Sequence, residues 1–122
     1  MRTILVLGAG RSTQSLIDYL LHHAESENWH LTLADQNLVW AVQKLRGHHR
    51  GTAIALNAGD REARRALISG KFITVSMLPA FMHPEVASDC LDLGVHLATA
   101  SYQSEALAKM SEAAKRKGLI FL

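Results

Sequence analysis

The chain has 122 residues, which is enough for one domain with a hydrophobic core and too few for two ordinary domains. Apolar residues make up 48% and charged residues 20%, the balance of a soluble globular protein, and a net charge of +2 is too small to indicate nucleic-acid binding. No apolar run approaches the roughly 20 residues of a membrane span. The apolar residues after Met1 are not followed by the small residues of a signal-peptide cleavage site. The single cysteine, Cys90, excludes a disulfide framework. We therefore expect a cytoplasmic protein with neither a nucleic-acid nor a membrane partner.

The first half of the chain alternates short apolar runs with stretches in which apolar residues recur at helical spacing. Each apolar run predicts a buried strand and each periodic stretch a helix, and the polar residues 25–28 predict a turn. Gly47 is typical of a helix end, and residues 57–60 combine turn residues with a helix cap. In chain order we predict a strand at 4–7, a helix at about 12–23, a strand at 30–34, a helix marked by Leu38 to Leu45 and a strand at 52–56.

The second half continues the same alternation. Pro79 ends a strand, Pro84 suits the first turn of a helix, and Ser104 caps the last helix, whose final turn carries the cations at 115–117 where the helix dipole favours them. In chain order we predict a short helix from Asp60 to about Ser69, a strand at 72–78, a helix from Pro84 to before Gly94, a strand at 95–100, a helix from Ser104 with Leu107, Met110 and Ala114 on one face, and a strand at 119–122.

Six short strands that alternate with five helices indicate an α/β fold whose parallel sheet is covered on both faces. Right-handed crossovers make this an open, doubly wound, Rossmann-like sheet, for which we predict the order 3-2-1-4-5-6. The length excludes an eight-stranded α/β barrel. In a doubly wound sheet, ligands bind at the carboxyl ends of the strands, where the strand order reverses.

The segment from Gly8 to Thr13 has the pattern G-x-G-x-x-T between the first predicted strand and the first predicted helix. Gly8 permits a tight turn, and Gly10 lacks a Cβ, so that a pyrophosphate can approach the backbone. We expect the N–H groups of Arg11, Ser12 and Thr13 to face this anion, aided by the helix dipole. Thr13 stands where a third Gly or Ala would allow the closest packing of helix on strand. The alternative is a structural turn that happens to contain two glycines.

Asp35 ends the second predicted strand, 27 residues after Gly8 (35 − 8). This is close to the roughly 20-residue offset of the acid that binds an adenosine ribose, and a carboxylate there repels a 2′-phosphate. We therefore expect NAD in preference to NADP, although Asp35 could instead cap the second helix. Arg11 could lie over the adenine, reach a 2′-phosphate or be solvated. Ala58 and Asp60 follow the third strand and are expected to contact the adenine edge, with simple helix capping by Asp60 as the alternative.

Two segments carry a family resemblance: LGAGRSTQSLIDYLL at 7–21 and VSMLPAFMHPEVASDCLDLGVHLATASY at 75–102. They resemble the N-terminal nucleotide-binding domain of the saccharopine dehydrogenase (saccharopine reductase) family, most specifically in LP at 78–79, HP at 83–84 and ASY at 100–102. The resemblance implies an oxidoreductase of the lysine-metabolism type. In that family a nicotinamide hydride reduces an imine formed from the amino group of glutamate and the aldehyde of aminoadipate semialdehyde.

The resemblance also implies roles for residues after the fourth and fifth strands. Met77, Leu78 and Pro79 would line the wall beside the nicotinamide, and Ser101 and Tyr102 would lie at the substrate-facing end of the sheet. The alternative for Ser101 and Tyr102 is a role in turn formation and packing.

His83 would lie at the mouth of the same cleft, where it could transfer a proton near neutral pH, or it only precedes the helix that starts at Pro84. The catalytic residues stay unassigned, with His83 and Tyr102 as candidates. No metal site is expected, because the adjacent pairs His22-His23 and His48-His49 point different ways on their segments.

The family continues with a large second domain that forms most of the substrate pocket, and this chain is expected to lack it. We therefore expect a single NAD(P)-binding domain, residues 1–122, that binds the cofactor without being catalytically competent alone. The apolar residues 119–122 would then form an exposed sheet edge, through which we expect homo-oligomers. An alternative function is an NAD-sensing regulatory module of a transport protein, which would share the glycine turn and Asp35.

Overall fold

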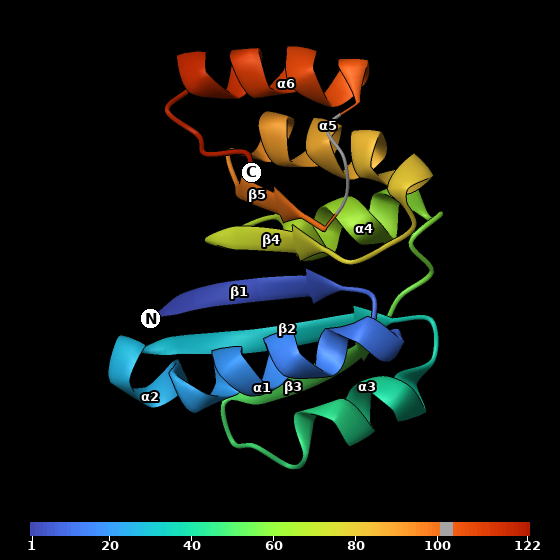
Figure 1. Cartoon of the computed structure of the whole chain (residues 1–122), viewed down its shortest axis with the longest axis vertical. Coiled ribbons are helices and arrows are strands. Elements are labelled where there is room, and N and C mark those ends of the chain that lie inside the picture. The colour runs from blue at the N-terminus through green and yellow to red at the C-terminus, as the bar shows by residue number, and fades with distance from the viewer. Residues whose placement is uncertain (101–103) are drawn as a thin grey trace.

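The computed structural model describes residues 1–100 and 104–122, and within them one five-stranded parallel sheet (Figure 1). The predictions made for Ser101 and Tyr102 lie outside the described residues. The strands are β1 (Arg2–Leu7), β2 (Trp29–Asp35), β3 (Gly51–Ala55), β4 (Ile73–Ser76) and β5 (His96–Thr99). They lie in the order β3-β2-β1-β4-β5, and each neighbouring pair is parallel. The predicted fold class is confirmed, and the strand order reverses between β1 and β4.

The segment predicted as a sixth strand lies beside β5, as expected, but forms a single bridge there, with Leu97 opposite Phe121. The Leu97 N–H donates to the Ile120 carbonyl at 3.0 Å, and the Leu122 N–H donates to the Leu97 carbonyl at 2.8 Å. The Leu119 N–H still donates to Ala114, within the end of the preceding helix, at 2.8 Å. The chain therefore reaches the sheet only at its last residues, and the pairing is too short to form a strand.

Helices connect the strands, and most lie where the apolar spacing predicts them. The described helices are η1 (Arg11–Thr13), α1 (Gln14–His22), α2 (Ala24–Glu27), α3 (Leu38–Leu45), α4 (Arg61–Ile68), η2 (Ala80–Met82), α5 (His83–Leu93) and α6 (Glu105–Arg116). The turn predicted at 25–28 is wrong, because most of this segment is the short helix α2, which ends at Asn28 with a left-handed φ of 56°. Ala24 is the one buried residue of α2, so the helix has no apolar periodicity by which a sequence could reveal it.

Side-chain caps fix where several helices begin. The Asp60 carboxylate accepts from the Ala63 N–H at 3.1 Å, and the Ser104 hydroxyl oxygen accepts from the Leu107 N–H at 3.2 Å. The Asn37 side chain accepts from the Trp40 N–H at 3.2 Å at the start of α3. Each such cap stabilises a helix by about 1 kcal/mol. The capping predicted at Asp60 and Ser104 is confirmed.

Alternate residues of β1 divide the hydrophobic core between the two faces of the sheet. Leu5 and Leu7 pack with buried residues of α4, α5 and α6, whereas Ile4 and Val6 pack with those of α1 and α3. Figure 1 shows the same two layers of helices on the sheet. Because these strands are parallel, the carboxyl ends of β1 to β4 lie together at one edge of the sheet. In the residues that the structure describes, none of the helices has both the length and the apolarity that crossing a membrane requires.

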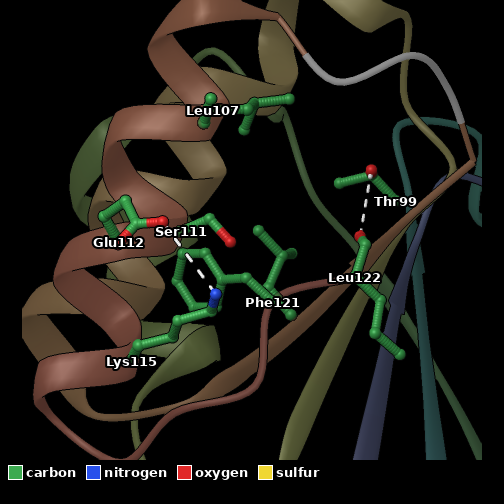
Figure 2. Close-up of a pocket in the computed structure, with 9 residues that line it drawn as sticks. Thr99, Leu107, Ser111, Glu112, Lys115, Phe121 and Leu122 are labelled. Carbon is green, nitrogen blue, oxygen red and sulfur yellow. Dashed lines mark hydrogen bonds and ion pairs between the residues drawn. The ribbon is translucent and has the colours of Figure 1, made fainter.

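A pocket of about 520 Å³ lies at the β5 edge of the sheet, between α6 and the end of the chain (Figure 2). Leu97, Leu107 and Phe121 give it an apolar floor, and Glu112 and Lys115 line its rim on α6. None of its lining residues belongs to the glycine turn or to the strand ends at which the order reverses.

Candidate functional site

Gly8 makes the sharp turn that ends β1. Its φ is +101°, a value that side-chain-bearing residues rarely adopt, and its N–H donates to the Ala34 carbonyl at 2.8 Å. A Cβ at this position would lie 3.1 Å from both the carbonyl carbon and the oxygen of Met77. The turn therefore needs glycine both for its backbone conformation and for the close approach of β1 to the end of β4.

Gly10 meets a different environment. Its backbone is extended, with φ −69° and ψ −177°, and a Cβ built there would have no heavy atom within 4 Å. Among the described residues, the N–H groups of Gly10, Arg11 and Ser12 have no hydrogen-bond acceptor. Three unpartnered donors beside open space at the start of a helical segment form a suitable site for an anionic group such as a pyrophosphate.

Thr13 does not contribute a free N–H to this site. Its N–H donates to the Gly10 carbonyl at 3.2 Å, and its hydroxyl donates to the same oxygen at 2.7 Å. The expectation that the Thr13 N–H faces an anion is therefore wrong, because this group closes the first helical turn. The side chain is 1% exposed, so the residue that replaces the usual third glycine is accommodated in the interior with its hydroxyl satisfied.

Asp35 links the glycine turn to the end of β2. One carboxylate oxygen accepts from the Ala9 N–H at 3.0 Å, and the other accepts from the Asn37 N–H at 3.0 Å. The alternative that Asp35 caps the following helix is wrong, because Asn37 holds the capping position of α3. Each carboxylate oxygen keeps a further lone pair, which suits it to accept from a ligand hydroxyl.

A pocket of about 270 Å³ lies at the carboxyl ends of the strands beside this carboxylate. It brings together four of the predicted site residues, Asp35, Ala58, Leu78 and Pro79. Its position at the reversal of strand order is the place where doubly wound sheets bind ligands. Asp60 does not line this pocket, since its carboxylate caps α4.

Met77, Leu78 and Pro79 follow β4 and pass next to the glycine turn. The Met77 N–H donates to the Leu7 carbonyl at 2.8 Å, which continues the pairing of β1 and β4 up to Gly8. The backbone of Met77 therefore forms the wall against which Gly8 turns, while Leu78 and Pro79 face the pocket beyond it.

A second hollow, of about 430 Å³, lies against the glycine turn. Gly10 and Arg11 line it together with Trp40, Lys44 and Arg46, so three cations surround it. Arg11 is exposed and has no ion-pair partner in the described part of the chain. The sequence gives no signal for the contribution of Lys44 and Arg46, because nothing in it shows that α3 lies beside the glycine turn.

His83 is not at the mouth of the cleft, and that prediction is wrong. Its ring is 1% exposed, and Nδ1 lies 2.9 Å from the Ser76 hydroxyl oxygen at the end of β4. The helix α5 begins at His83 itself, which turns the ring inward against β4. Burial lowers the pKa of His83 below its ordinary value of 6.5, so the imidazole is neutral at neutral pH.

The remaining candidates for metal or thiol chemistry are not built for it. In residues 1–100 and 104–122, no group of three or more His, Cys, Asp or Glu side chains could hold a metal ion. Cys90 is 0% exposed, and burial raises the pKa of its thiol to about 12, which disfavours the reactive thiolate.

Arg64 is a site-related residue for which sequence reasoning made no prediction. Its side chain is 4% exposed, and one of its terminal nitrogens donates to the Ala58 carbonyl at 2.9 Å. Arg64 precedes the buried Ile68 by one helical turn, so the spacing places a cation on the buried face of α4. A charged residue at an inward position is a sequence signal that could have identified it.

Comparison with known proteins shows to which family the chain belongs. Residues 4–122 match the family model described as the saccharopine dehydrogenase NADP binding domain. Saccharopine dehydrogenase (NADP(+), L-glutamate-forming) of Schizosaccharomyces pombe is 31% identical over 120 residues, which cover 98% of this chain and 26% of that protein. Alpha-aminoadipic semialdehyde synthase of Arabidopsis thaliana is 29% identical over 136 residues, which cover 98% of this chain and 13% of that protein.

Among solved structures, apo histidine-tagged saccharopine dehydrogenase (L-Glu forming) from Saccharomyces cerevisiae has a TM-score of 0.86 and 24% sequence identity, over 99% of this chain and 26% of that one. This chain thus spans about a quarter or less of the relatives that it matches. The turn at Gly8 and Gly10, the open N–H groups and the adjoining pocket fit a nicotinamide dinucleotide, the class of cofactor for which the family model is named. The chain therefore belongs to the saccharopine dehydrogenase NADP binding domain family.

Proposed function

We propose that this chain is the cofactor-binding part of an oxidoreductase that reduces an imine or oxidises an amino acid. The observation that carries the proposal is the glycine turn, which presents three unpartnered N–H groups and an open Cβ position next to a pocket at the reversal of strand order. When bound, the nicotinamide supplies or accepts the hydride. The chain's own residues bind and orient the dinucleotide.

The proposed placement follows the groups that each part of the pocket offers. The pyrophosphate binds at the N–H groups of residues 10–12, and the adenosine ribose donates to Asp35. The adenine lies against the loop at 57–60. The nicotinamide lies beside Met77, Leu78 and Pro79, whose apolar side chains suit its ring face. Outside the described residues, Ser101 and Tyr102 are proposed for the substrate-facing end of the sheet.

The substrate is proposed by analogy with the relatives. Their printed names refer to saccharopine, to L-glutamate and to aminoadipic semialdehyde. Hydride addition to an imine formed from the aldehyde and the amino group of glutamate would give the secondary amine of saccharopine. In the reverse direction, hydride removal gives the imine, which water hydrolyses to the aldehyde and glutamate. Because this chain spans at most 26% of the relatives cited above, we propose that polypeptide outside these residues binds the substrate. The alternative of a regulatory module in a transport protein is not favoured by these relatives, which are named as dehydrogenases and synthases.

We further propose that NAD is bound in preference to NADP, although the family model is named for NADP. The Asp35 carboxylate lies at the pocket wall, where a 2′-phosphate would meet its negative charge. Arg11, Lys44 and Arg46 line the second hollow, which Asp35 does not line. The proposal is that the negative charge of Asp35, rather than these cations, decides which of the two dinucleotides is preferred.

The test is a titration of the chain with NADH and with NADPH, in which nicotinamide fluorescence reports binding. We expect NADH to bind more tightly, and we expect Asp35→Asn to raise the affinity for NADPH relative to NADH by about tenfold, because removing one charge near a phosphate is worth about 1–2 kcal/mol in a partly solvated site. Glu112→Gln, which removes one exposed charge from α6, serves as the control and should leave the ratio unchanged.

Two outcomes would contradict these proposals separately. If the folded chain binds neither dinucleotide up to millimolar concentration, the cofactor-binding role fails. If both bind and Asp35→Asn leaves their ratio at its original value, the role of Asp35 in cofactor choice fails while the binding role stands.

We also propose a second copy of the chain as a partner, bound through the residues near Leu122 at the β5 edge. The side chain of Leu122 is 77% exposed, and the neighbouring pocket has an apolar floor. An exposed apolar edge of a sheet is a surface that recruits another chain.

A further inference from the structure

The hollow against the glycine turn is lined by three cations and, among the residues that the structure describes, by no carboxylate. Gly10 and Arg11 line it from the turn, and Lys44 and Arg46 line it from the end of α3 and the residue after that helix. A Cβ at Gly10 would meet no heavy atom within 4 Å, so a ligand has room next to this residue. The cations of α3 therefore border the space that the glycine turn leaves open.

Gln14, the first residue of α1, holds the end of α3 in this place. Its side-chain Nε2 donates to the Lys44 carbonyl at 3.0 Å and to the Asp18 carboxylate at 2.8 Å. Gln14 directly follows the helical segment that begins at Arg11. The half-buried Lys44 thus lines the hollow because α1 and α3 are bonded to each other next to the turn.

The charges of this hollow are not balanced within the protein. Arg46 pairs with Asp18, whose carboxylate oxygen lies 3.3 Å from Arg46 Nε, and both side chains are exposed. In residues 1–100 and 104–122, neither Arg11 nor Lys44 lies within ion-pair distance of a carboxylate. The hollow therefore has an excess of positive charge, whereas the unpartnered N–H groups of the turn are neutral donors.

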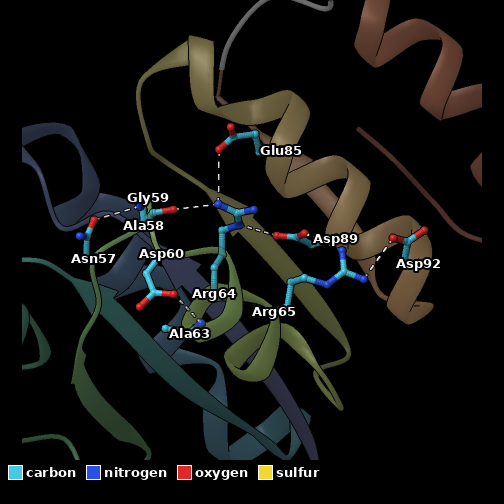
Figure 3. A network of polar contacts seen from close by, with 10 residues as sticks. All are labelled: Asn57, Ala58, Gly59, Asp60, Ala63, Arg64, Arg65, Glu85, Asp89 and Asp92. Carbon is cyan, nitrogen blue, oxygen red and sulfur yellow. Dashed lines mark hydrogen bonds and ion pairs between the residues drawn. The ribbon is translucent and has the colours of Figure 1, made fainter.

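Two cations on the other face of the sheet, Arg64 and Arg65 of α4, have the opposite arrangement (Figure 3). Both donate to the carboxylate of Asp89 on α5, which is 1% exposed. Carboxylates of the chain itself thus satisfy these guanidinium groups. The charges of Arg11 and Lys44 are free for a ligand in a way that those of α4 are not.

From this arrangement we infer that Lys44 and Arg11 attract the pyrophosphate of the dinucleotide by their charge, while the N–H groups of residues 10–12 orient it. The inference rests on the proposed function, because it requires the pyrophosphate to lie at Gly10. Both phosphates of this group are negatively charged, and NAD and NADP share it. The two cations therefore strengthen the binding of both dinucleotides, and Asp18 opposes them because its carboxylate neutralises Arg46.

The experiment measures the affinity of the 122-residue chain for NADH and for NADPH by nicotinamide fluorescence at low salt. Lys44→Gln removes one positive charge, and we expect both affinities to fall by about three- to tenfold, the effect of one cation near a phosphate in a partly solvated site. The ratio of the two affinities should stay at its wild-type value. Lys44→Arg keeps the charge and should keep both affinities.

Asp18→Asn should have the opposite effect. Because it leaves Arg46 without its carboxylate partner, we expect it to raise both affinities by about twofold. A merely structural role for these side chains would lower the affinity in both variants, since each substitution would then only damage the contact between α1 and α3. Opposite signs for Lys44→Gln and Asp18→Asn are therefore a signature of charge.

The salt dependence of binding gives a second signature. We expect the wild type to lose NADH affinity between about 0.05 and 0.5 M NaCl, because salt screens exposed charges, and we expect Lys44→Gln to lose less. Lys71→Gln is the matched control. Lys71 is also a half-buried lysine with no carboxylate within ion-pair distance in the described part of the chain, but it lies before the amino end of β4, away from the glycine turn. This variant should bind as the wild type does at each salt concentration.

The outcomes separate the inference from the proposed function. A parallel fall in both affinities in Lys44→Gln, with Lys71→Gln unchanged, supports the inference. A folded Lys44→Gln that binds NADH as the wild type does, an equal fall in Lys71→Gln, or a fall confined to NADPH, which would assign the cation to the 2′-phosphate, overturns the inference and leaves the proposed function intact. A wild type that binds neither dinucleotide overturns both.

Discussion

Gly8 and Gly10 stand two residues apart in one turn but are required for different reasons. Gly8 has φ +101° and a backbone 3.1 Å from the place of a Cβ, so Gly8→Ala adds backbone strain and a clash. We expect it to lower the free energy of unfolding by about 2 kcal/mol or more. Gly10→Ala places a methyl group in open space with an ordinary φ, so we expect stability to stay within about 0.5 kcal/mol of the wild type.

The two glycine variants should separate folding from binding. The methyl group of Gly10→Ala would occupy the space proposed for the pyrophosphate, and we expect NADH affinity to fall at least tenfold while urea unfolding is unchanged. Urea unfolding and NADH titration of both variants check the pair. If Gly10→Ala binds NADH as the wild type does, the pyrophosphate does not approach this side of the turn.

His83 makes stability depend on pH in a direction that its burial fixes. Burial lowers the pKa of His83 in the folded chain below 6.5. In the unfolded chain the same histidine takes up its proton at the ordinary pKa of about 6.5. Between these two pKa values the unfolded chain binds more protons than the folded one, so stability rises with pH. The neutral, buried His83 therefore contributes fully to the free energy of unfolding above about pH 6.5. This contribution is lost as the pH falls through the pKa of His83 in the folded state.

We therefore expect the wild type to lose stability more steeply than His83→Asn between pH 7 and pH 5, measured by urea unfolding at each pH. Asparagine can still contact the Ser76 hydroxyl but does not titrate in this range. His22→Asn, at an exposed histidine on α1, is the control and should follow the wild type. Equal slopes for the wild type and His83→Asn would show that burial of His83 does not set this pH dependence.

At the scale of secondary-structure elements, the sequence predicts a strand where apolar residues are continuous and a helix where they recur at helical spacing, and it does not predict an element that has neither pattern. The strand β1 is a continuous buried run and the helix α5 buries residues at helical spacing, and both lie where predicted. The helix α2 buries a single alanine and was predicted as a turn. The apolar residues of α3 predicted a helix correctly, but they do not all face the core. Ala41 and Leu45 are the buried residues of this helix, whereas Leu38 and Val42 are exposed.

The candidate site likewise contains some residues that the sequence predicted and others that it did not. The turn at Gly8 and the place of Asp35 depend on local backbone chemistry and on where a strand ends, so they were predictable from the sequence. The contacts of His83 with Ser76 and of Arg64 with Asp89 depend on how α5 packs against β4 and α4. Packing between elements has no short sequence signature, and for this reason His83 was misplaced and Arg64 received no prediction.

At the scale of the whole molecule, the two edges of the sheet carry different features. The β3 edge belongs to the half of the sheet that carries the glycine turn and Asp35. The β5 edge ends in residues 120–122, of which Ile120 is 58% and Leu122 77% exposed. In the described part of the molecule, the Phe121 N–H and carbonyl have no hydrogen-bond partner. We propose that this edge, with the pocket of Figure 2 beside it, pairs with a second copy of the chain.

Self-association through this edge should be sensitive to a charge placed on it. We expect the wild type to form dimers or larger species at high concentration in light scattering, and we expect Ile120→Lys to shift it to the monomer, because a lysine on an edge disfavours pairing. Val39→Lys is the matched control, since Val39 is a similarly exposed apolar residue, 62% exposed, on α3 in the other half of the molecule. If association survives Ile120→Lys but is lost in Val39→Lys, the contact lies on α3. If the wild type is monomeric at every concentration, the edge formed by the single bridge at Phe121 is too short for another chain to pair with.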